Sequence, residues 1–225
     1  MPGYILHLTA ARMYLDLLPP TDPLKYNLDL QNDFFAGNLL PDAVTQKKES
    51  HFRDPLYRDY FIEWPHLDFF LHKYASLLDK PVCLGYYLHL YIDKMFFKYY
   101  LPQVVEYYDV NNAIVQLREK VDHVLLKKSG EEIPLETYLS EEYYYGDYTR
   151  MNTYLMEHFH LPESLTPVPN PGIEEVDFQN LDKVMAELDT YKKIPSNAIN
   201  ELKVFDAEEL ILFLQNCCLS FYHRL

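Results

Sequence analysis

The sequence predicts an all-α fold, a multi-helix bundle followed by a C-terminal helical extension. Apolar residues recur with helical spacing along most of the 225 residues, and no stretch alternates apolar and polar residues as a strand does. Prolines and glycines interrupt this spacing where helices end. With 48% hydrophobic and 24% charged residues, the chain is long enough to bury a sizeable core.

The apolar spacing in the first two thirds of the chain predicts a series of helices. The first runs from Ile5 to Leu18 and ends at two consecutive prolines, and a second runs toward Phe35 and ends at Gly37-Asn38. Pro81 suits the first turn of a further helix, because its missing N–H is not needed there. The remaining helices are predicted over residues 67–78, 82–100, 111–128 and 147–159.

Proline content divides the chain. Four prolines between Leu161 and Gly172 predict a linker over residues 161–173, which follows a metal-binding helical domain of residues 1–160. Residues 174–225 are predicted to form two helices, over 174–192 and 206–222, that pack on this domain. Asp206 and Glu209 have the spacing of a capping box at the start of the last helix.

The net charge excludes several classes of partner. Lys and Arg number 20 against 34 Asp and Glu, giving −14, and no basic stripe is present, so a long nucleic acid is not expected to bind. The six glycines form no phosphate-binding loop. A small phosphorylated substrate is still compatible, since bound divalent cations reverse the sign of the charge locally.

Other features indicate a cytoplasmic protein. Three cysteines, two of them adjacent at 217 and 218, do not form a disulfide framework and suit a reducing compartment. The first residues lack a basic region and a cleavage signature, and no apolar run is long enough for a transmembrane segment. The sequence makes no prediction of the oligomeric state.

One helical segment indicates a functional site. Gly85, His89 and Asp93 follow one another at intervals of four residues in an otherwise apolar stretch, so all three lie on one helix face. A buried imidazole and carboxylate on one face need a partner or a bound ion. Glycine within a helix costs about 1 kcal/mol relative to alanine, which indicates a close approach at Gly85. The alternative is a buried ion pair beside a packing notch.

Three more residues complete a candidate ligand set. His7 lies within the apolar first helix, Asp42 follows Pro41 in a turn, and His51 ends a polar loop. Each has an ordinary explanation: a satisfied helix histidine, a turn residue that caps a helix, or a surface loop histidine. Together with His89 and Asp93 they make a nitrogen and oxygen set without thiolate, suited to zinc and also to manganese or iron.

These residues occur in four motifs whose order resembles that of the zinc-dependent phospholipase C family and the related single-strand nucleases. The resemblance covers roughly Met1 to Pro102. The motifs are listed here as they stand: His7-Leu8; Gly37-Asn38-Leu39-Leu40-Pro41-Asp42; Ser50-His51-Phe52; and Leu84-Gly85-Tyr86-Tyr87-Leu88-His89-Leu90, with Asp93 three residues on.

The resemblance implies an all-helical zinc hydrolase fold of the phospholipase C and nuclease type. It implies that Asp42, His51, His89 and Asp93 hold one metal ion, and that Asp93 bridges to a second ion that also takes His7. It further implies that metal-bound hydroxide attacks a phosphodiester or phospholipid-like substrate, with Asp42 as the catalytic base.

The sequence also departs from the family. The third metal of the family uses a histidine six residues after the helical aspartate, where this chain has Tyr99, and a later His-x-x-x-Glu, which this chain lacks. The nearest substitutes are the reversed pairs Glu119/His123 and Asp68/His72. His7 is also closer to the start of the chain than its counterpart. These departures disfavour a third metal ion and a phospholipid substrate.

Two other hypotheses follow from the same residues. The first is a non-catalytic helical interaction protein, in which a structural metal or a polar cluster holds the helices together. The second is a nuclease, which a charge of −14 disfavours.

Other polar residues are expected to lie outside the site. Asp147 is expected to cap the helix at 147–159, although Asp147 and Asn152 could also reach the site. The remaining histidines are expected to be structural or at the surface, with His66 as the first exception to consider: His66, His72, His123, His158, His160 and His223.

Overall fold

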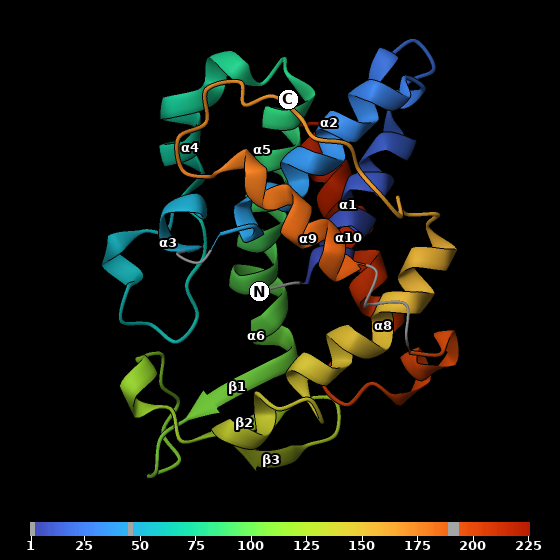
Figure 1. Ribbon diagram of the computed structural model, residues 1–225. Coiled ribbons are helices and arrows are strands. Elements are labelled where there is room, and N and C mark those ends of the chain that lie inside the picture. The colour runs from blue at the N-terminus through green and yellow to red at the C-terminus, as the bar shows by residue number, and fades with distance from the viewer. Residues whose placement is uncertain (1–2, 45–46, 189–193) are drawn as a thin grey trace.

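The computed structural model describes residues 3–44, 47–188 and 194–225, and this part of the chain is mostly helical, with a small sheet at one end (Figure 1). The predominance of helix predicted from the sequence is therefore confirmed. The longer helices are α1 (Tyr4–Leu17), α2 (Leu28–Leu39), α4 (Leu67–Tyr74), α5 (Pro81–Met95), α8 (Tyr144–His158), α9 (Leu181–Leu188) and α10 (Ala207–Tyr222). Single-turn helices are α3 (Lys47–Ser50), α6 (Leu101–Val104) and α7 (Leu135–Tyr138).

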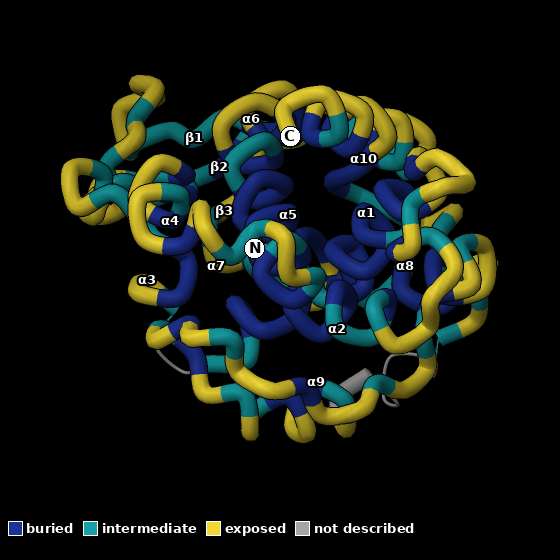
Figure 2. Tube along the Cα trace, turned by 90° about the horizontal axis from the view of Figure 1, so that it is seen from above, coloured by how far each residue is buried: buried dark blue, intermediate teal, exposed yellow. Residues whose placement is uncertain are grey.

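Helix α5 runs through the buried middle of the molecule and packs tightly against α2 (Figure 2). A Cβ on Gly85 would lie 2.0 Å from the carbonyl oxygen of Phe34, and one on Gly37 would lie 1.9 Å from that of Val82. Both glycines therefore permit contact between the two backbones. Helix α2 ends at Leu39, one residue beyond the end predicted at Gly37-Asn38, so Gly37 lies inside its last turn.

The prediction of a helix over residues 111–128 was wrong. The strands β1 (Val105–Tyr108), β2 (His123–Leu126) and β3 (Glu131–Pro134) form an antiparallel sheet in the order β1-β2-β3. In β2, Val124 and Leu126 are buried while His123 and Leu125 are partly exposed, which is strand alternation over only four residues. Gly130, at a φ of 75°, makes the turn between β2 and β3.

The last part of the chain packs against the first. Helix α10 lies along α1, where the Cys218 thiol donates to the carbonyl of Ala10 at 3.2 Å. Asp206 accepts hydrogen bonds from the backbone N–H groups of Glu208 and Glu209, which confirms it as the N-cap. The helix predicted over 174–192 is shorter and begins at Leu181; residues 189–192 of that prediction lie outside the described part.

The predicted linker and domain boundaries stay a prediction, although several contacts cross them. Glu175 accepts a hydrogen bond from the Tyr74 hydroxyl at 2.6 Å and pairs with Lys73, so the segment after the proline-rich stretch contacts α4. Asn32 of α2 bonds to the backbone of Thr166. Within the described residues, no helix is both long and apolar enough to cross a membrane.

Asp147 does not cap its helix, contrary to the prediction, because α8 begins earlier, at Tyr144. Its carboxylate is fully buried and accepts hydrogen bonds from the backbone N–H groups of Lys203, Val204 and Phe205 at 2.7 to 3.1 Å. It also pairs with Arg150 at 3.1 Å. Asp147 thus fixes the segment that leads into α10.

We expect Asp147→Ala to lower the free energy of unfolding by about 3 kcal/mol, because the variant leaves several buried N–H groups without an acceptor. Urea unfolding followed by circular dichroism measures the change. The exposed Asp182, in the first turn of α9, provides the control Asp182→Ala. Equal stability of the two variants would show that the 203–205 segment does not depend on this carboxylate.

Candidate metal centre

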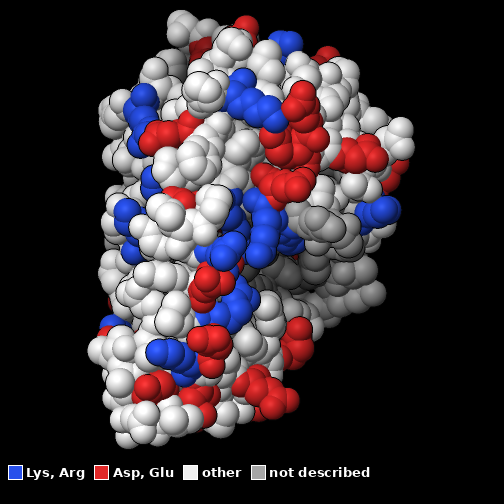
Figure 3. All heavy atoms as spheres, turned by 90° about the vertical axis from the view of Figure 1, so that its left-hand side faces the viewer, with Lys and Arg blue, Asp and Glu red and all other residues white. Residues whose placement is uncertain are grey.

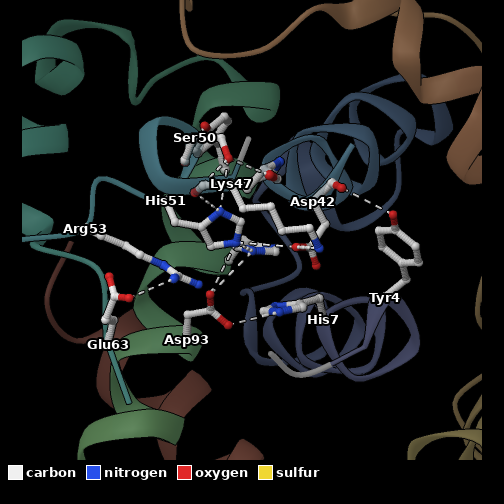
Figure 4. A network of polar contacts seen from close by, with 12 residues as sticks. Tyr4, His7, Asp42, Lys47, Ser50, His51, Arg53, Glu63 and Asp93 are labelled. Carbon is white, nitrogen blue, oxygen red and sulfur yellow. Dashed lines mark hydrogen bonds and ion pairs between the residues drawn. The ribbon is translucent and has the colours of Figure 1, made fainter. Parts of the chain in front are cut away.

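Five polar side chains from different parts of the chain meet beside the middle of α5 (Figure 4). They are the five residues that the sequence suggested as ligands: His7 from α1, Asp42 from the short 3-10 turn after α2, His51 directly after α3, and His89 and Asp93 from α5. None is more than 5% exposed. The structure therefore brings the predicted set together, while metal binding by it stays a prediction.

The His51 side chain lies at the centre of the group. Its Nε2 atom is 3.2 Å from Nε2 of His89, 3.4 Å from Oδ1 of Asp42 and 3.4 Å from Oδ2 of Asp93. On the other side of Asp93, Nε2 of His7 lies 3.3 Å from Oδ1. The ligand atoms form two triads that share His89, one with His7 and Asp93 and one with Asp42 and His51, each within 4.8 Å.

The second nitrogen of each central histidine fixes its tautomer. Nδ1 of His89 is 2.8 Å from the carbonyl oxygen of Asn38, and Nδ1 of His51 is 2.9 Å from that of Lys47. A carbonyl only accepts, so in both rings Nδ1 carries the proton. In the neutral rings both Nε2 atoms then present lone pairs to each other at 3.2 Å. This contact is repulsive unless a cation lies nearby.

Close packing of α2 and α5 places Asn38 for this role. The Asn38 side chain donates a hydrogen bond to the carbonyl of Gly85 at 3.2 Å, and the backbone carbonyl of Asn38 accepts a hydrogen bond from Nδ1 of His89. Such an outer hydrogen bond orients an imidazole and raises its basicity as a ligand. Gly85 is thus connected to the site through Asn38.

Several buried atoms of the group have no hydrogen-bond partner among the residues that the structure describes. They are both ring nitrogens of His7 and Oδ1 of Asp93, whose mutual contact lacks hydrogen-bond geometry. The His7 ring stacks on that of His89 with 3.7 Å between centroids. A buried polar group without a partner costs about 1–3 kcal/mol. A cation bound between Nε2 of His7 and Oδ1 of Asp93 would remove that cost for these two atoms.

Contacts of the two neighbouring residues hold His51 in place, with a strained backbone at Phe52. The next residue, Phe52, has a φ of 47°, which is unusual for a bulky side chain. Its ring packs edge-on against Phe70 at 5.3 Å, and the Ser50 hydroxyl donates to the carbonyl of Pro41 at 2.7 Å. Strained conformations of this kind concentrate at functional sites. The sequence motif around His51 gave no signal of it.

The electrostatic environment favours charged carboxylates at Asp42 and Asp93 and a neutral His89. Burial tends to raise the pKa of Asp93, but the contact with His7 and the charges of the neighbouring histidines lower it to about 2. The pKa of Asp42 is held well below its usual range, against burial, by His51, His89 and Lys47. Burial, followed by the charge of His7, lowers the pKa of His89 to about 3. These are the protonation states that metal ligands require.

We expect the metal-free protein to lose stability in acid through His89. Its pKa of about 3 lies below the 6.5 of an unfolded histidine, so the unfolded chain binds more protons between these values. Stability is fully present above pH 6.5 and falls, by up to about 1.4 kcal/mol per pH unit, as the pH drops toward 3. His89→Gln, compared with the wild type in urea unfolding between pH 4 and 7, should reduce this dependence. An equal slope of stability against pH in the variant and the wild type would contradict this role of His89.

A cleft of about 350 Å³ reaches the site from the surface. Its lining includes Asp42, Lys47 and Asn152 together with the rings of Tyr4 and Tyr148. The Lys47 ammonium lies 2.7 Å from Oδ1 of Asp42 and is the only Lys or Arg among the described residues that line the cleft. Asn152 therefore does lie beside the site, and Lys47 is a site residue that the sequence did not indicate, because nothing in its motif distinguishes it from Lys48.

The positions considered for a third metal do not join the group. Tyr99 is 47% exposed, in a π-helical turn after α5. His66 lies 4.0 Å from Asp54 and stacks on Phe69. Among the described residues, the two triads are the only groups of three or more such side chains whose ligand atoms lie close together. Neither triad contains a residue of the reversed pairs Glu119/His123 and Asp68/His72.

Comparisons of the chain with protein-family models, with curated proteins and with solved structures returned no match.

Proposed function

We propose that this protein is a metal-dependent hydrolase of phosphoric esters that binds one or two zinc ions. One ion would take Asp42, His51, His89 and Asp93, and a second would take His7 together with Asp93. The observation that carries the proposal is the convergence of two buried imidazole lone pairs, 3.2 Å apart, between two carboxylates. Manganese or iron would also suit these nitrogen and oxygen ligands.

The distances support zinc. Ligand atoms at about 2.0–2.1 Å from a tetrahedral zinc ion lie about 3.3–3.4 Å from one another. The three contacts of His51 Nε2, at 3.2, 3.4 and 3.4 Å, agree with this spacing. The fixed tautomers of His51 and His89 supply the neutral nitrogen that a metal needs, so little rearrangement would accompany binding.

The chemistry follows from the side chains around the cleft. A bound divalent ion supplies a nucleophile at neutral pH by lowering the pKa of water. Asp42 is the carboxylate of the group that also lines the cleft, so it is placed to accept a proton from an entering nucleophile. A cleft of about 350 Å³ fits a small phosphodiester. These features support a small phosphorylated substrate.

The experiment is the hydrolysis of bis(p-nitrophenyl) phosphate by zinc-loaded protein, with zinc content measured for each variant. We expect turnover by the wild type and a loss of roughly 100-fold or more in kcat for Asp42→Asn, the usual size of a general-base effect. Glu141→Gln is the matched control, because Glu141 lines the same cleft but belongs to neither triad. A zinc-loaded wild type that does not hydrolyse the ester would contradict the proposal.

A structural metal is the second candidate, and one observation favours it. All five side chains are at most 5% exposed, and Lys47 contacts Asp42, the carboxylate of this group that lines the cleft. A structural zinc has four protein ligands, whereas a catalytic zinc keeps a position open to water. Cobalt substitution distinguishes them: a catalytic site changes its visible absorption spectrum when inorganic phosphate is added, and a closed site does not.

A further inference from the structure

The side chain of Asn152 lines the cleft at the candidate metal centre and has no part in the metal site itself. Asn152 belongs to α8 and is only 8% exposed, so it is more than nine-tenths buried. Its carboxamide makes no hydrogen bond to any residue that the structure describes. A buried polar group is nearly always paired with protein, water or a ligand. The amide of Asn152 is therefore a candidate ligand-binding group.

The Lys47 ammonium belongs to the same cleft. Figure 4 shows its side chain extending from α3 to Asp42, where Nζ lies 2.7 Å from Oδ1. Asp42 is the only acceptor that this ammonium has among the described residues, and the Lys47 side chain is 36% exposed. An ammonium group has three N–H donors. Two of them stay available to a ligand in the cleft while the third keeps the bond to Asp42, so binding does not require this ion pair to break.

The cleft brings both side chains within reach of one small ligand. Asn152, Lys47 and Asp42 all line it, and its volume of about 350 Å³ is enough for a small ester. An ester whose phosphoryl group lies beside Asp42 shares this space with the donors of Asn152 and Lys47. The non-bridging oxygens of a phosphoryl group accept hydrogen bonds from amide and ammonium donors. The other carboxylate of the lining, Glu141, is exposed, so solvent screens its charge.

The face of the molecule that carries α3 suits the approach of an anion. Figure 3 shows Lys and Arg side chains gathered in the middle of this face, although the net charge of the chain is −14. Side chains of one sign that lie together raise the local concentration of small ligands of the opposite sign. The charge of the whole chain therefore does not keep a small phosphate ester from this part of the surface.

We infer that Asn152 and Lys47 bind the phosphoryl group of the substrate, each by donating a hydrogen bond to a non-bridging oxygen. This inference rests on the proposed function, which places the phosphoryl group at the metal centre. It deepens that function by assigning one neutral and one charged donor to the phosphoryl oxygens, from two elements that are distant in the sequence. Neither residue takes part in the proton transfer assigned to Asp42.

Calorimetric titration of the zinc-loaded protein with inorganic phosphate tests the inference without requiring turnover. Asn152→Leu removes the amide at a similar volume, and Lys47→Met removes the ammonium at a similar length. We expect each variant to bind phosphate roughly tenfold more weakly than the wild type, as one lost hydrogen bond to a charged group predicts, with unchanged zinc content. Asn216→Leu and Lys48→Met are the matched controls, because Asn216 and Lys48 are exposed and do not line this cleft.

An unchanged affinity for phosphate in either zinc-loaded variant, Asn152→Leu or Lys47→Met, would overturn the inference, and so would a zinc-loaded wild type that binds no phosphate. Hydrolysis of bis(p-nitrophenyl) phosphate by the wild type would leave the proposed function standing in both cases. Phosphate binding that depends on both residues, in protein that does not hydrolyse the ester, would support the two donors and overturn the proposed function instead.

Discussion

Replacing Asp93 by alanine is expected to abolish zinc binding and ester hydrolysis together. Asp93 belongs to one triad and contacts His51 of the other, so its two oxygens face both groups. Its removal leaves His7, His51 and His89 without a carboxylate between them. We expect a fall in zinc affinity of at least 100-fold and a corresponding loss of turnover, as for the loss of a bridging ligand.

Elemental analysis of the dialysed protein and the ester assay measure both effects, and circular dichroism shows whether the helices remain. Asp68→Ala is the control, because Asp68 is an exposed carboxylate in the first turn of α4. Hydrolysis that survives Asp93→Ala at the rate of the wild type would rule out the assigned metal centre as the catalytic site.

Gly85→Ala is expected to destabilise the protein severely. The added Cβ would lie 2.0 Å from the carbonyl oxygen of Phe34 and 3.0 Å from the nitrogen of Asn38, both backbone atoms that cannot move alone. Helix α2 must therefore shift away from α5, which breaks the bond between Asn38 and His89. We expect a loss of about 3 kcal/mol or more in the free energy of unfolding, and weaker zinc binding in whatever remains folded.

Gly3→Ala is the matched control, because a Cβ at Gly3 would meet only Cβ of Tyr148, at an ordinary 3.9 Å. Thermal unfolding and zinc titration of both variants separate a packing effect from a general effect of replacing glycine. Equal stability of Gly85→Ala and the wild type would contradict the close approach of the two helices.

The sequence predicted the main helices and the residues of the candidate site because both leave local signals. Helical spacing extends over whole helices such as α5, and ligand types such as His89 and Asp93 are conspicuous in apolar surroundings. The capping role of Asp206 followed from a local pattern too. Each of these signals lies within a few residues of the feature that it predicts.

The features that the sequence missed depend on contacts between distant segments. Strands of four residues, such as β2, are too short for alternation to distinguish them from helix, so β2 fell within the helix predicted over 111–128. Asp147 binds a segment 56 to 58 residues away, and Glu63 pairs with Arg118, which lies 55 residues away. No local spacing indicates such partners, nor the pairing of Lys47 with Asp42.

X-ray absorption spectroscopy of protein purified without chelator and then loaded with zinc shows whether these side chains bind a metal ion. We predict one or two zinc ions per chain, bound only by nitrogen and oxygen at about 2.0–2.1 Å, with at least two imidazoles in the first coordination shell. Protein that binds no zinc, manganese or iron even after reconstitution would contradict the account and leave His51, His89, Asp42 and Asp93 as a buried polar cluster that holds the helices together.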